Sequence, residues 1–191
     1  MPTPGTMTMY LALATIAILL LLWAACLVLL LLITWGIIFY KVPFVPTPGA
    51  VVSEALKLLP LSSGDVLYDI GSGNGRMVFA FANACPSARV IGVEASPFPF
   101  LLTLLRRWGG ATRNASFIFK DFSNVSLAGA SHVYTYLLPS VMARLLPRFE
   151  KELAPGTRVL SCDFPFKSRT PLQTAKVNVG KFTYTLYVYE F

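Results

Sequence analysis

The residues that could do chemistry gather in one short stretch, VLYDIGSGNGR, at positions 66–76. An acid, Asp69, nearly ends a run of apolar residues, and glycines follow at positions 71, 73 and 75. Glycine permits positive φ and lets a ligand touch the backbone, and a helix that starts directly after such a loop presents free N–H groups and its positive dipole end. One glycine would indicate only a tight turn. Three at alternate positions, between a strand pattern and a helix pattern, favour a loop that binds a nucleotide-type ligand.

The spacing of the glycines narrows the choice of ligand. A dinucleotide fingerprint needs a glycine at the sixth position, where Arg76 stands, and a Walker-type loop needs Gly-Lys-Ser/Thr, which the loop lacks. The stretch instead resembles motif I of the class I S-adenosylmethionine-dependent methyltransferases, an acid followed by Gly-x-Gly-x-Gly.

This resemblance implies two more polar residues along the chain, and both are present. An acid is expected at the end of the second strand, where Glu94 stands in RVIGVEAS, and an acid or amide after the third, where Asp121 stands in FIFKDF. Glu94 could accept hydrogen bonds from both ribose hydroxyls. Asp121 could accept from the adenine amine while Phe122 or Phe119 covers the ring. Taken alone, Glu94 would be a solvated acid at a strand end and Asp121 a turn or cap residue.

The cofactor that the resemblance implies is S-adenosylmethionine. Its carboxylate suits the N–H groups of the glycine loop, and its ammonium suits the charge of Asp69. The residues predicted to bind it are Asp69, Gly71, Ser72, Gly73, Gly75, Glu94, Ala95, Asp121 and Phe122. No metal is expected, because the three cysteines lack metal-ligand spacing, and they fit a reducing compartment better than a disulfide framework.

A longer resemblance runs from position 43 to about 166. The matching stretches, in preserved order, are PFVPTP, GAVVSEALKLL, DIGSGNGR, GVEASP, FKDFS, LLPSVMARL and RVLSCDFPF. They resemble the small membrane-anchored protein-lysine methyltransferases that include the mitochondrial enzyme acting on the ATP synthase c-subunit. Asn74 and Ser96 stand where that family usually has Asp and Asn, and these departures bear on substrate and efficiency. The resemblance implies N-methylation of a lysine.

Methyl transfer from a sulfonium has a neutral leaving group, so the protein mainly aligns the nucleophile and excludes water. A lysine nucleophile must be neutral, and burial and nearby positive charge lower its pKa from about 10.4. The predicted catalytic residues are Tyr136 and Pro139, after the fourth strand, and Asp163, after the fifth. Tyr134 and Tyr136 could flank the amine with their ring faces, although strand packing explains at least one of them. His132, the only histidine, is expected to be structural.

The elements that must position these residues alternate between strand and helix patterns. Strands are expected at 66–70, 89–93, 116–120, 132–137 and 157–162, helices at 50–59, 76–84, 97–108 and 140–152, and a closing hairpin at 176–179 and 182–190. Such alternation implies right-handed crossovers and a parallel sheet covered on both faces. The predicted fold class is therefore α/β, a Rossmann-like, doubly wound, mostly parallel seven-stranded sheet with an antiparallel C-terminal edge hairpin.

The first forty residues contain no Lys, Arg, Asp or Glu, and residues 10–40 form one apolar run. A helix of this length rises about 46 Å, more than the ~30 Å hydrocarbon core requires. A cleaved signal peptide is disfavoured because no basic residue precedes the run and the run is too long. We expect one transmembrane helix, with Lys41 and Lys57 indicating that the domain lies on the cytoplasmic or matrix-like side.

The sequence thus divides into a flank (1–9), an anchor (10–40), a proline-containing linker with a short helix (41–63) and a methyltransferase domain (64–191). The net charge of +7 would draw a tethered domain to an anionic lipid surface. Nucleic-acid binding is disfavoured because the basic residues are scattered and no nucleic-acid motif is present. The expected partner is a membrane protein with a lysine near the bilayer.

Two alternatives stay open. The target could be a lipid amine or a quinone-like membrane molecule, because the anchor fits that substrate equally well. The chain could instead be a non-catalytic scaffold with a methyltransferase fold, although the intact motif acids and glycines argue against this.

Overall fold

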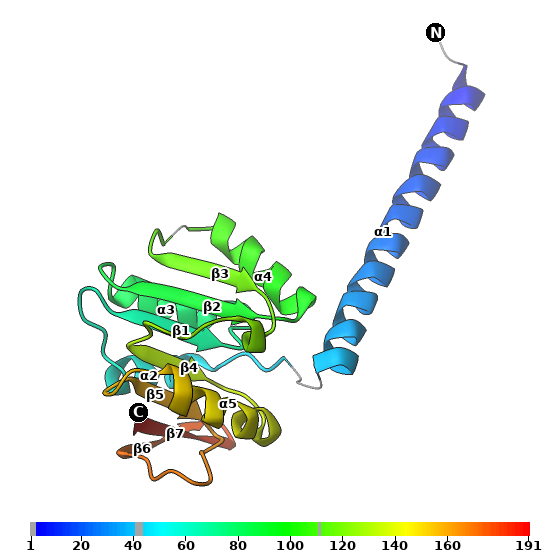
Figure 1. Cartoon of the computed structure of the whole chain (residues 1–191). Coiled ribbons are helices and arrows are strands. Elements are labelled where there is room, and N and C mark those ends of the chain that lie inside the picture. The colour runs from blue at the N-terminus through cyan, green and yellow to red at the C-terminus, as the bar shows by residue number, and fades with distance from the viewer. Residues whose placement is uncertain (1–2, 41–43, 111) are drawn as a thin grey trace.

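The computed structural model describes residues 3–40, 44–110 and 112–191. These form a seven-stranded sheet with helices on both faces and one long N-terminal helix that projects away from it (Figure 1). The strands are β1 (Val66–Ile70), β2 (Arg89–Glu94), β3 (Ala115–Phe119), β4 (His132–Thr135), β5 (Arg158–Cys162), β6 (Gln173–Val179) and β7 (Phe182–Glu190). The helices are α1 (Pro4–Tyr40), α2 (Gly49–Leu58), α3 (Arg76–Ala84), α4 (Pro97–Trp108) and α5 (Pro139–Glu152), with a 3-10 turn η1 (Phe122–Asn124). Positions 41–43, which include Lys41 and open the predicted linker, lie outside the described residues.

The strand order is β3-β2-β1-β4-β5-β7-β6. Strands β1 to β5 are parallel, and β7 lies antiparallel between β5 and β6. This confirms the predicted doubly wound, mostly parallel sheet with an antiparallel C-terminal hairpin. The strand order reverses direction between β1 and β4, and in open α/β sheets a ligand crevice forms at such a switch point, outside the carboxyl ends of the strands.

Alternate residues of the central strands supply two separate hydrophobic cores. Leu67 of β1 packs in the core with α2 and α3, whereas the next residue, Tyr68, packs in the core with α5. The hairpin strand β7 contributes to both, because Leu186 joins the first core and Tyr189 the second. The sheet is therefore packed on both faces, and the loops at its carboxyl edge start from a rigid base.

Two element boundaries differ by more than one residue from the sequence-based expectation. Strand β4 ends at Thr135, and α5 already begins at Pro139, whose fixed φ suits the first turn of a helix. Tyr136 therefore lies in the loop between them. Strand β6 begins at Gln173, earlier than its local pattern indicates, because its residues pair continuously with β7.

Helix α1 is long and apolar enough to cross a membrane, as judged by its length and composition alone. Almost all of its described side chains are exposed. Its polar side chains bond within the helix, since the hydroxyls of Thr15 and Thr34 donate to the carbonyls of Leu11 and Leu30 at 2.8 and 2.9 Å. Such internal bonding is what a helix needs where no water can satisfy its polar groups.

Candidate active site

A pocket opens at the switch point of the sheet, beside the carboxyl ends of β1, β2 and β4. It brings together most of the residues that the sequence predicts for the cofactor: Asp69, Gly71, Ser72, Gly73, Glu94, Ala95, Asp121 and Phe122. Tyr136, predicted to act in the reaction, lines the same pocket. Gly75, Pro139 and Asp163 lie outside its wall.

Four backbone N–H groups of the glycine loop are already engaged within the protein. The N–H groups of Gly71 and Ser72 both donate to the carbonyl of Val93, at 2.9 and 3.0 Å, and that of Gly75 donates to Ser72. The N–H of Gly73 donates to the Glu94 carboxylate at 2.8 Å. This differs from the expectation that these groups face a ligand carboxylate, because β2 and its terminal acid lie close enough to bind them.

Gly73 also has a steric reason to be glycine. Its φ is +57°, and a Cβ placed there would lie 2.8 Å from the ring of Phe44. Phe44 belongs to the segment that follows α1 and precedes α2, and this segment lines the pocket. The Arg76 guanidinium fixes the segment by donating to the carbonyl of Thr47 at 2.6 Å. Residues 44–47 of the predicted linker are therefore part of the wall of the pocket.

Asp69 is a buried acid, and the described residues offer it no compensating charge. It is 2% exposed, and among those residues its Oδ2 has no hydrogen-bond partner, like the nearby Ser72 Oγ. Burial raises the pKa of Asp69 well above its ordinary value, and the charge of Glu94 raises it further. A buried carboxyl group with an oxygen that lacks a hydrogen-bond partner among the described residues favours the binding of a cationic ligand group.

Glu94 joins the two loops that frame the pocket. Its Oε2 accepts from the N–H of Gly73, and its Oε1 accepts from the N–H of Ser96 at 2.7 Å. Burial raises the pKa of Glu94, although these backbone hydrogen bonds oppose the shift. Since an ionised carboxylate has about four acceptor sites, Glu94 can still accept bonds from a ligand in the pocket.

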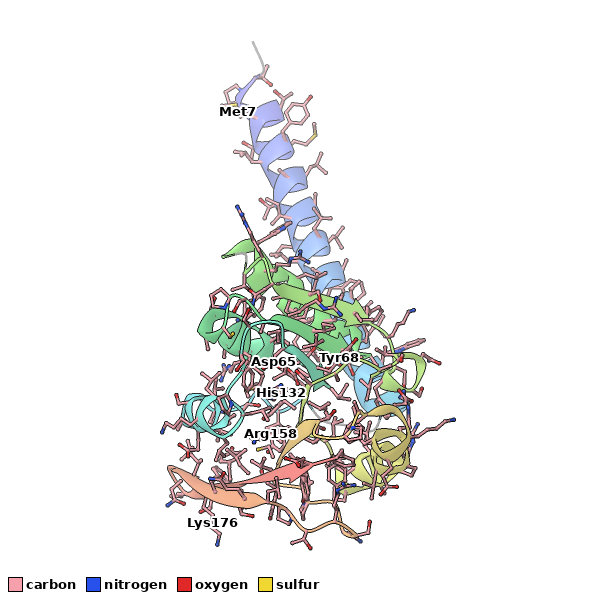
Figure 2. The ribbon with its side chains drawn as sticks, turned by 60° about the vertical axis from the view of Figure 1, so that its left-hand side comes forward. Met7, Asp65, Tyr68, His132, Arg158 and Lys176 are labelled. Atoms are coloured by element: carbon pink, nitrogen blue, oxygen red, sulfur yellow. The ribbon has the colours of Figure 1, made fainter. Side chains whose placement is uncertain are left out.

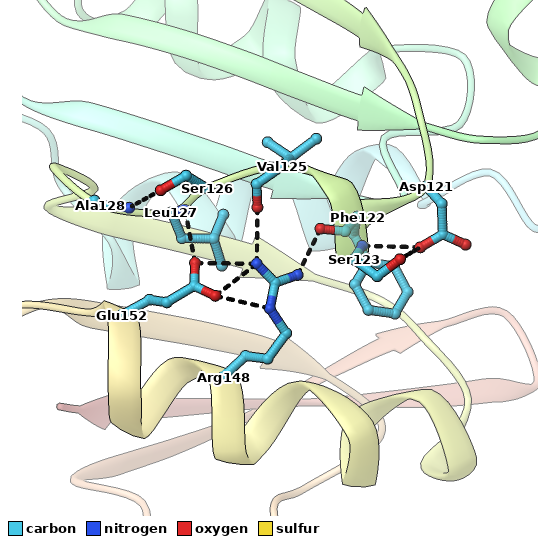
Figure 3. A network of polar contacts seen from close by, with 9 residues as sticks. All are labelled: Asp121, Phe122, Ser123, Val125, Ser126, Leu127, Ala128, Arg148 and Glu152. Atoms are coloured by element: carbon cyan, nitrogen blue, oxygen red, sulfur yellow. Dashed lines mark hydrogen bonds and ion pairs between the residues drawn. The ribbon is translucent and has the colours of Figure 1, made fainter.

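Asp121 caps the turn η1 as well as lining the pocket. Its Oδ1 accepts from the N–H and the hydroxyl of Ser123, at 2.8 and 2.6 Å (Figure 3). Both interpretations of Asp121 in the sequence, as a cap and as a pocket residue, therefore agree with its position.

The loop that carries Asp121 is held by helix α5 (Figure 3). The Arg148 guanidinium donates to the carbonyls of Phe122 and Val125, at 2.6 and 2.8 Å. It also forms an ion pair with Glu152 at 2.7 Å, and Glu152 accepts from the N–H of Leu127 at 3.0 Å. One ion pair thus fixes the backbone on the C-terminal side of Asp121.

Tyr136 lies between the pocket and a small aromatic group outside it. Its ring centroid is 6.2 Å from that of Phe164 and 6.4 Å from that of Tyr184. Burial raises the pKa of the Tyr136 hydroxyl, and the Asp163 carboxylate beside it adds to the shift. Asp163 accepts from the N–H of Thr185 at 2.8 Å and has a φ of +61°, a strained value for a residue other than glycine.

The remaining predicted residues have structural positions. Gly75 precedes α3 with a φ of +71°, and a Cβ there would meet the ring of Phe117 at 2.9 Å. Pro139 is the first residue of α5, and it does not line the pocket. His132 lies at the opposite end of β4 from the pocket, where its Nδ1 is 2.9 Å from Ser131 Oγ and 3.8 Å from Asp65 Oδ1 (Figure 2).

The pocket residues that were not predicted from the sequence include Phe44, Arg76, Lys120 and Arg144. Arg76 belongs to the motif itself, so its place directly after the last glycine was a usable signal. Phe44 carried no signal, because only the fold brings the segment before α2 against the glycine loop. Arg144 lies one helical turn into α5, with its guanidinium 5.6 Å from the centroid of the Phe122 ring.

A family model for the ANTKMT methyltransferase domain matches residues 69–173. A protein-lysine N-methyltransferase of Saccharolobus islandicus is 36% identical over 149 residues, which cover 78% of this chain and 92% of that protein. A lysine N-methyltransferase of the ATP synthase c-subunit, from Rattus norvegicus, is 38% identical over 133 residues, which cover 69% of this chain and 60% of that protein. The chain thus spans nearly all of the archaeal relative and less than two thirds of the rat one.

Among solved structures, an RNA methyltransferase from Salinibacter ruber in complex with S-adenosyl-L-homocysteine matches with a TM-score of 0.68. It is 34% identical, and the match covers 76% of this chain and 93% of that one. The bound S-adenosyl-L-homocysteine is the demethylated product of S-adenosylmethionine.

The fold and the pocket define an S-adenosylmethionine-dependent methyltransferase. The pocket suits this cofactor because the unpartnered Asp69 oxygen can meet its ammonium and the pair of buried acids, Asp69 and Glu94, can offset its sulfonium charge. The chain belongs to the ANTKMT methyltransferase domain family.

Removal of the Arg148 guanidinium should destabilise the protein and weaken cofactor binding together. Arg148→Met leaves the carbonyls of Phe122 and Val125 and the Glu152 carboxylate without their donor. We expect the free energy of unfolding to fall by about 1.5–3 kcal/mol, as measured by urea denaturation in detergent. Lys151→Met, at an exposed position on the same helix, should change it by less than about 0.5 kcal/mol. Equal effects of the two substitutions would contradict the role assigned to Arg148.

Cofactor binding should release a proton from Asp69. Because burial raises the pKa of this carboxyl, the free protein keeps it protonated above the ordinary carboxyl range, whereas a bound ammonium favours the carboxylate. Affinity should therefore rise with pH, by up to about tenfold per unit, and level off above the raised pKa. Calorimetry in two buffers of different ionisation enthalpy measures the released proton.

Two variants check the assignment of this proton. Asp69→Asn should weaken binding and abolish the proton release, whereas Asp65→Asn, at the opposite end of β1, should leave it unchanged. Binding without proton exchange in the unmodified protein would count against the assignment.

Proposed function

We propose that the protein transfers a methyl group from S-adenosylmethionine to the side-chain amine of a lysine in a membrane-associated protein. The observation that carries the proposal is the 36% identity to a named protein-lysine N-methyltransferase over 92% of that protein's length. The other support comes from the pocket and from the long apolar helix α1.

In this proposal the pocket residues divide the work of holding the cofactor. Asp69 pairs with the ammonium, Glu94 accepts from the ribose hydroxyls, and Asp121 accepts from the adenine amine, with Phe122 against the ring. Arg76 binds the carboxylate, since three of the loop N–H groups are engaged with Val93 and Glu94. The cofactor supplies an electrophilic methyl group on a sulfonium.

Residues in and beside the pocket would keep the substrate lysine amine neutral and position it. Lys120 and Arg144 line the pocket, and their positive charge favours the neutral form of an incoming lysine. The ring of Tyr136 lies at the pocket edge, where it can contact the amine with its face. The carboxylate of Asp163, next to Tyr136, can accept a hydrogen bond or the departing proton. No acid is needed for the leaving group.

Helix α1 is proposed to anchor the domain in a membrane. Its span is continuous, apolar and exposed, and only a short segment separates it from α2. With the N-terminus outside, the domain lies on the cytoplasmic or matrix-like side, where its net charge of +7 attracts it to anionic lipid. Tethering raises the effective concentration of membrane targets over soluble ones.

A second candidate substrate is RNA, because the matched Salinibacter ruber structure is named as an RNA methyltransferase. The scattered basic residues and the apolar helix favour the protein substrate. A lipid amine or a quinone-like molecule would be equally accessible to a domain tethered at the membrane. The scaffold alternative predicts no methyl transfer at all.

The substrate can be identified by transfer of a labelled methyl group in membranes. With labelled S-adenosylmethionine, we expect a methyl-lysine in a membrane protein, found by mass spectrometry. Gly73→Arg should abolish the label, because its side chain would enter the space held by Phe44. Gly110→Ala, where a Cβ meets open space, is the matched control. Label confined to extracted lipid or to RNA would refute the protein substrate, and no label in any fraction would favour the scaffold.

The orientation can be tested with protease. Digestion of right-side-out vesicles from the outside should leave the domain intact, because a single span with the N-terminus outside keeps residues 44–191 inside. Permeabilised vesicles serve as the control, since the domain should then be cut. Cleavage of the domain in sealed vesicles would reverse the proposed orientation.

A further inference from the structure

Helix α4 carries its apolar side chains on the outside. Thr103 is fully buried, whereas Leu101, Leu104, Leu105 and Trp108 are all exposed, Trp108 to 89%. A helix of a soluble domain normally buries its apolar stripe and exposes its polar residues. The arrangement in α4 is the reverse.

The inner face of α4 explains why the threonine points inward. The Thr103 hydroxyl donates to the carbonyl of Gly73 at 2.8 Å, and the Arg106 guanidinium donates to the carbonyl of Asn74 at 3.3 Å. Pro99 of the same helix lines the cofactor pocket. Helix α4 is therefore bonded to the glycine loop, and its outer face has a fixed position relative to the pocket.

The exposed residues form one surface that includes the edge of the sheet. Phe119 of the edge strand β3 is 51% exposed, and its ring centroid lies 4.9 Å from that of Phe100 in α4. We call this surface the α4 face, and it consists of Leu101, Leu104, Leu105, Trp108 and Phe119. Contiguous apolar surface of this kind on a soluble domain is typical of an interaction site.

Two observations indicate what covers the α4 face. Helix α1 contacts α4, and in Figure 1 α4 is the labelled helix of the domain that comes nearest to the lower end of α1. The α4 face therefore belongs to a helix that contacts the segment proposed to enter the bilayer.

The composition of the face agrees with a bilayer surface. Arg106 and Arg107 are exposed next to Trp108. An apolar patch bordered by arginines and ending in a tryptophan matches the headgroup level of an anionic bilayer, where amphipathic rings reside and basic side chains meet phosphates.

We propose that the α4 face inserts into the surface of an anionic bilayer and holds the domain in one orientation on the membrane. The proposal rests on the membrane anchor of the proposed function, and it adds a second attachment point that the tether alone does not provide. Since α4 is bonded to the glycine loop, insertion sets the position of the pocket at the membrane surface. The accessible lysines are then those next to the bilayer.

The test measures whether Trp108 contacts lipid in the full-length protein. The chain has three tryptophans, so Trp23→Phe combined with Trp35→Phe leaves Trp108 alone. In vesicles that contain anionic lipid, lipids brominated near the headgroup should quench its fluorescence, and acrylamide in the water should quench it less than in denatured protein. This readout needs no methyl transfer, so it is independent of whether lysine is the substrate.

A matched control moves the probe to the far edge of the sheet. Phe182, the first residue of β7, is 70% exposed. Phe182→Trp combined with Trp108→Phe in the same background should respond to acrylamide and not to brominated lipid. Trp108 open to acrylamide and unaffected by brominated lipid would overturn the proposal. Protection from both quenchers would also overturn it, because it would indicate that a second copy of the chain covers the face.

A functional comparison uses Leu105→Ser with Trp108→Ser. Neither residue lines the cofactor pocket, so cofactor affinity should be unchanged, which also verifies folding. Labelling of membrane-embedded targets should fall about tenfold, in line with the loss of two apolar contacts with the bilayer. An unchanged rate on membrane targets, with normal cofactor binding, would show that the α4 face does not orient the enzyme.

Discussion

The carboxylate of Glu94 is the contact on which the architecture of the site depends. It accepts from the N–H of Gly73 on one side and from the N–H of Ser96 on the other, so a single buried group joins the loop after β1 to the loop after β2. These loops form the two walls of the crevice at the switch point. The glycine loop is further bonded to Val93, and α4, which starts after Ser96, returns a bond from Thr103 to Gly73. Hydrogen bonds thus connect the glycine loop, the loop after β2 and α4 in a closed ring that includes Glu94.

This ring has an electrostatic cost that a ligand can offset. Burial raises the pKa of both Asp69 and Glu94, and the charge of Glu94 further disfavours the ionised form of Asp69. A cation in the pocket would favour both carboxylates and would contribute stability to the complex. Stability is therefore given up locally for function, as is common at binding sites. In the free protein, the contribution of Asp69 to stability is present at low pH and is lost as the pH rises through its raised pKa.

The sequence predicted the fold and the acids of the site because both follow from local signals. Alternating strand and helix patterns determine a doubly wound sheet, and an acid after each strand must lie at the carboxyl edge. The sequence did not predict how the loop N–H groups are used, because their partners Val93 and Glu94 reach them only through the pairing of β1 with β2. The sequence also could not show whether Pro139 begins a helix or belongs to a substrate-facing loop, because both have the same local pattern.

The apolar pattern of α4 shows a further limit of sequence reasoning. Periodicity reveals that a helix has an apolar stripe, but not whether protein or another medium covers it. In α4 the decisive residue is Thr103, whose hydroxyl needs the Gly73 carbonyl and so rotates the leucines outward.

The segment before α2 lies between helix α1 and the pocket residues. Phe44 fills the space above Gly73, and Thr47 holds Arg76 through its carbonyl, so residues 44–47 form part of the wall of the pocket. A tether that only held the domain near a membrane would need none of these contacts. Because Arg76 binds the segment and also lines the pocket, any displacement of the segment must move a pocket residue. The position of residues 44–47 and the shape of the cofactor pocket are therefore coupled through Arg76.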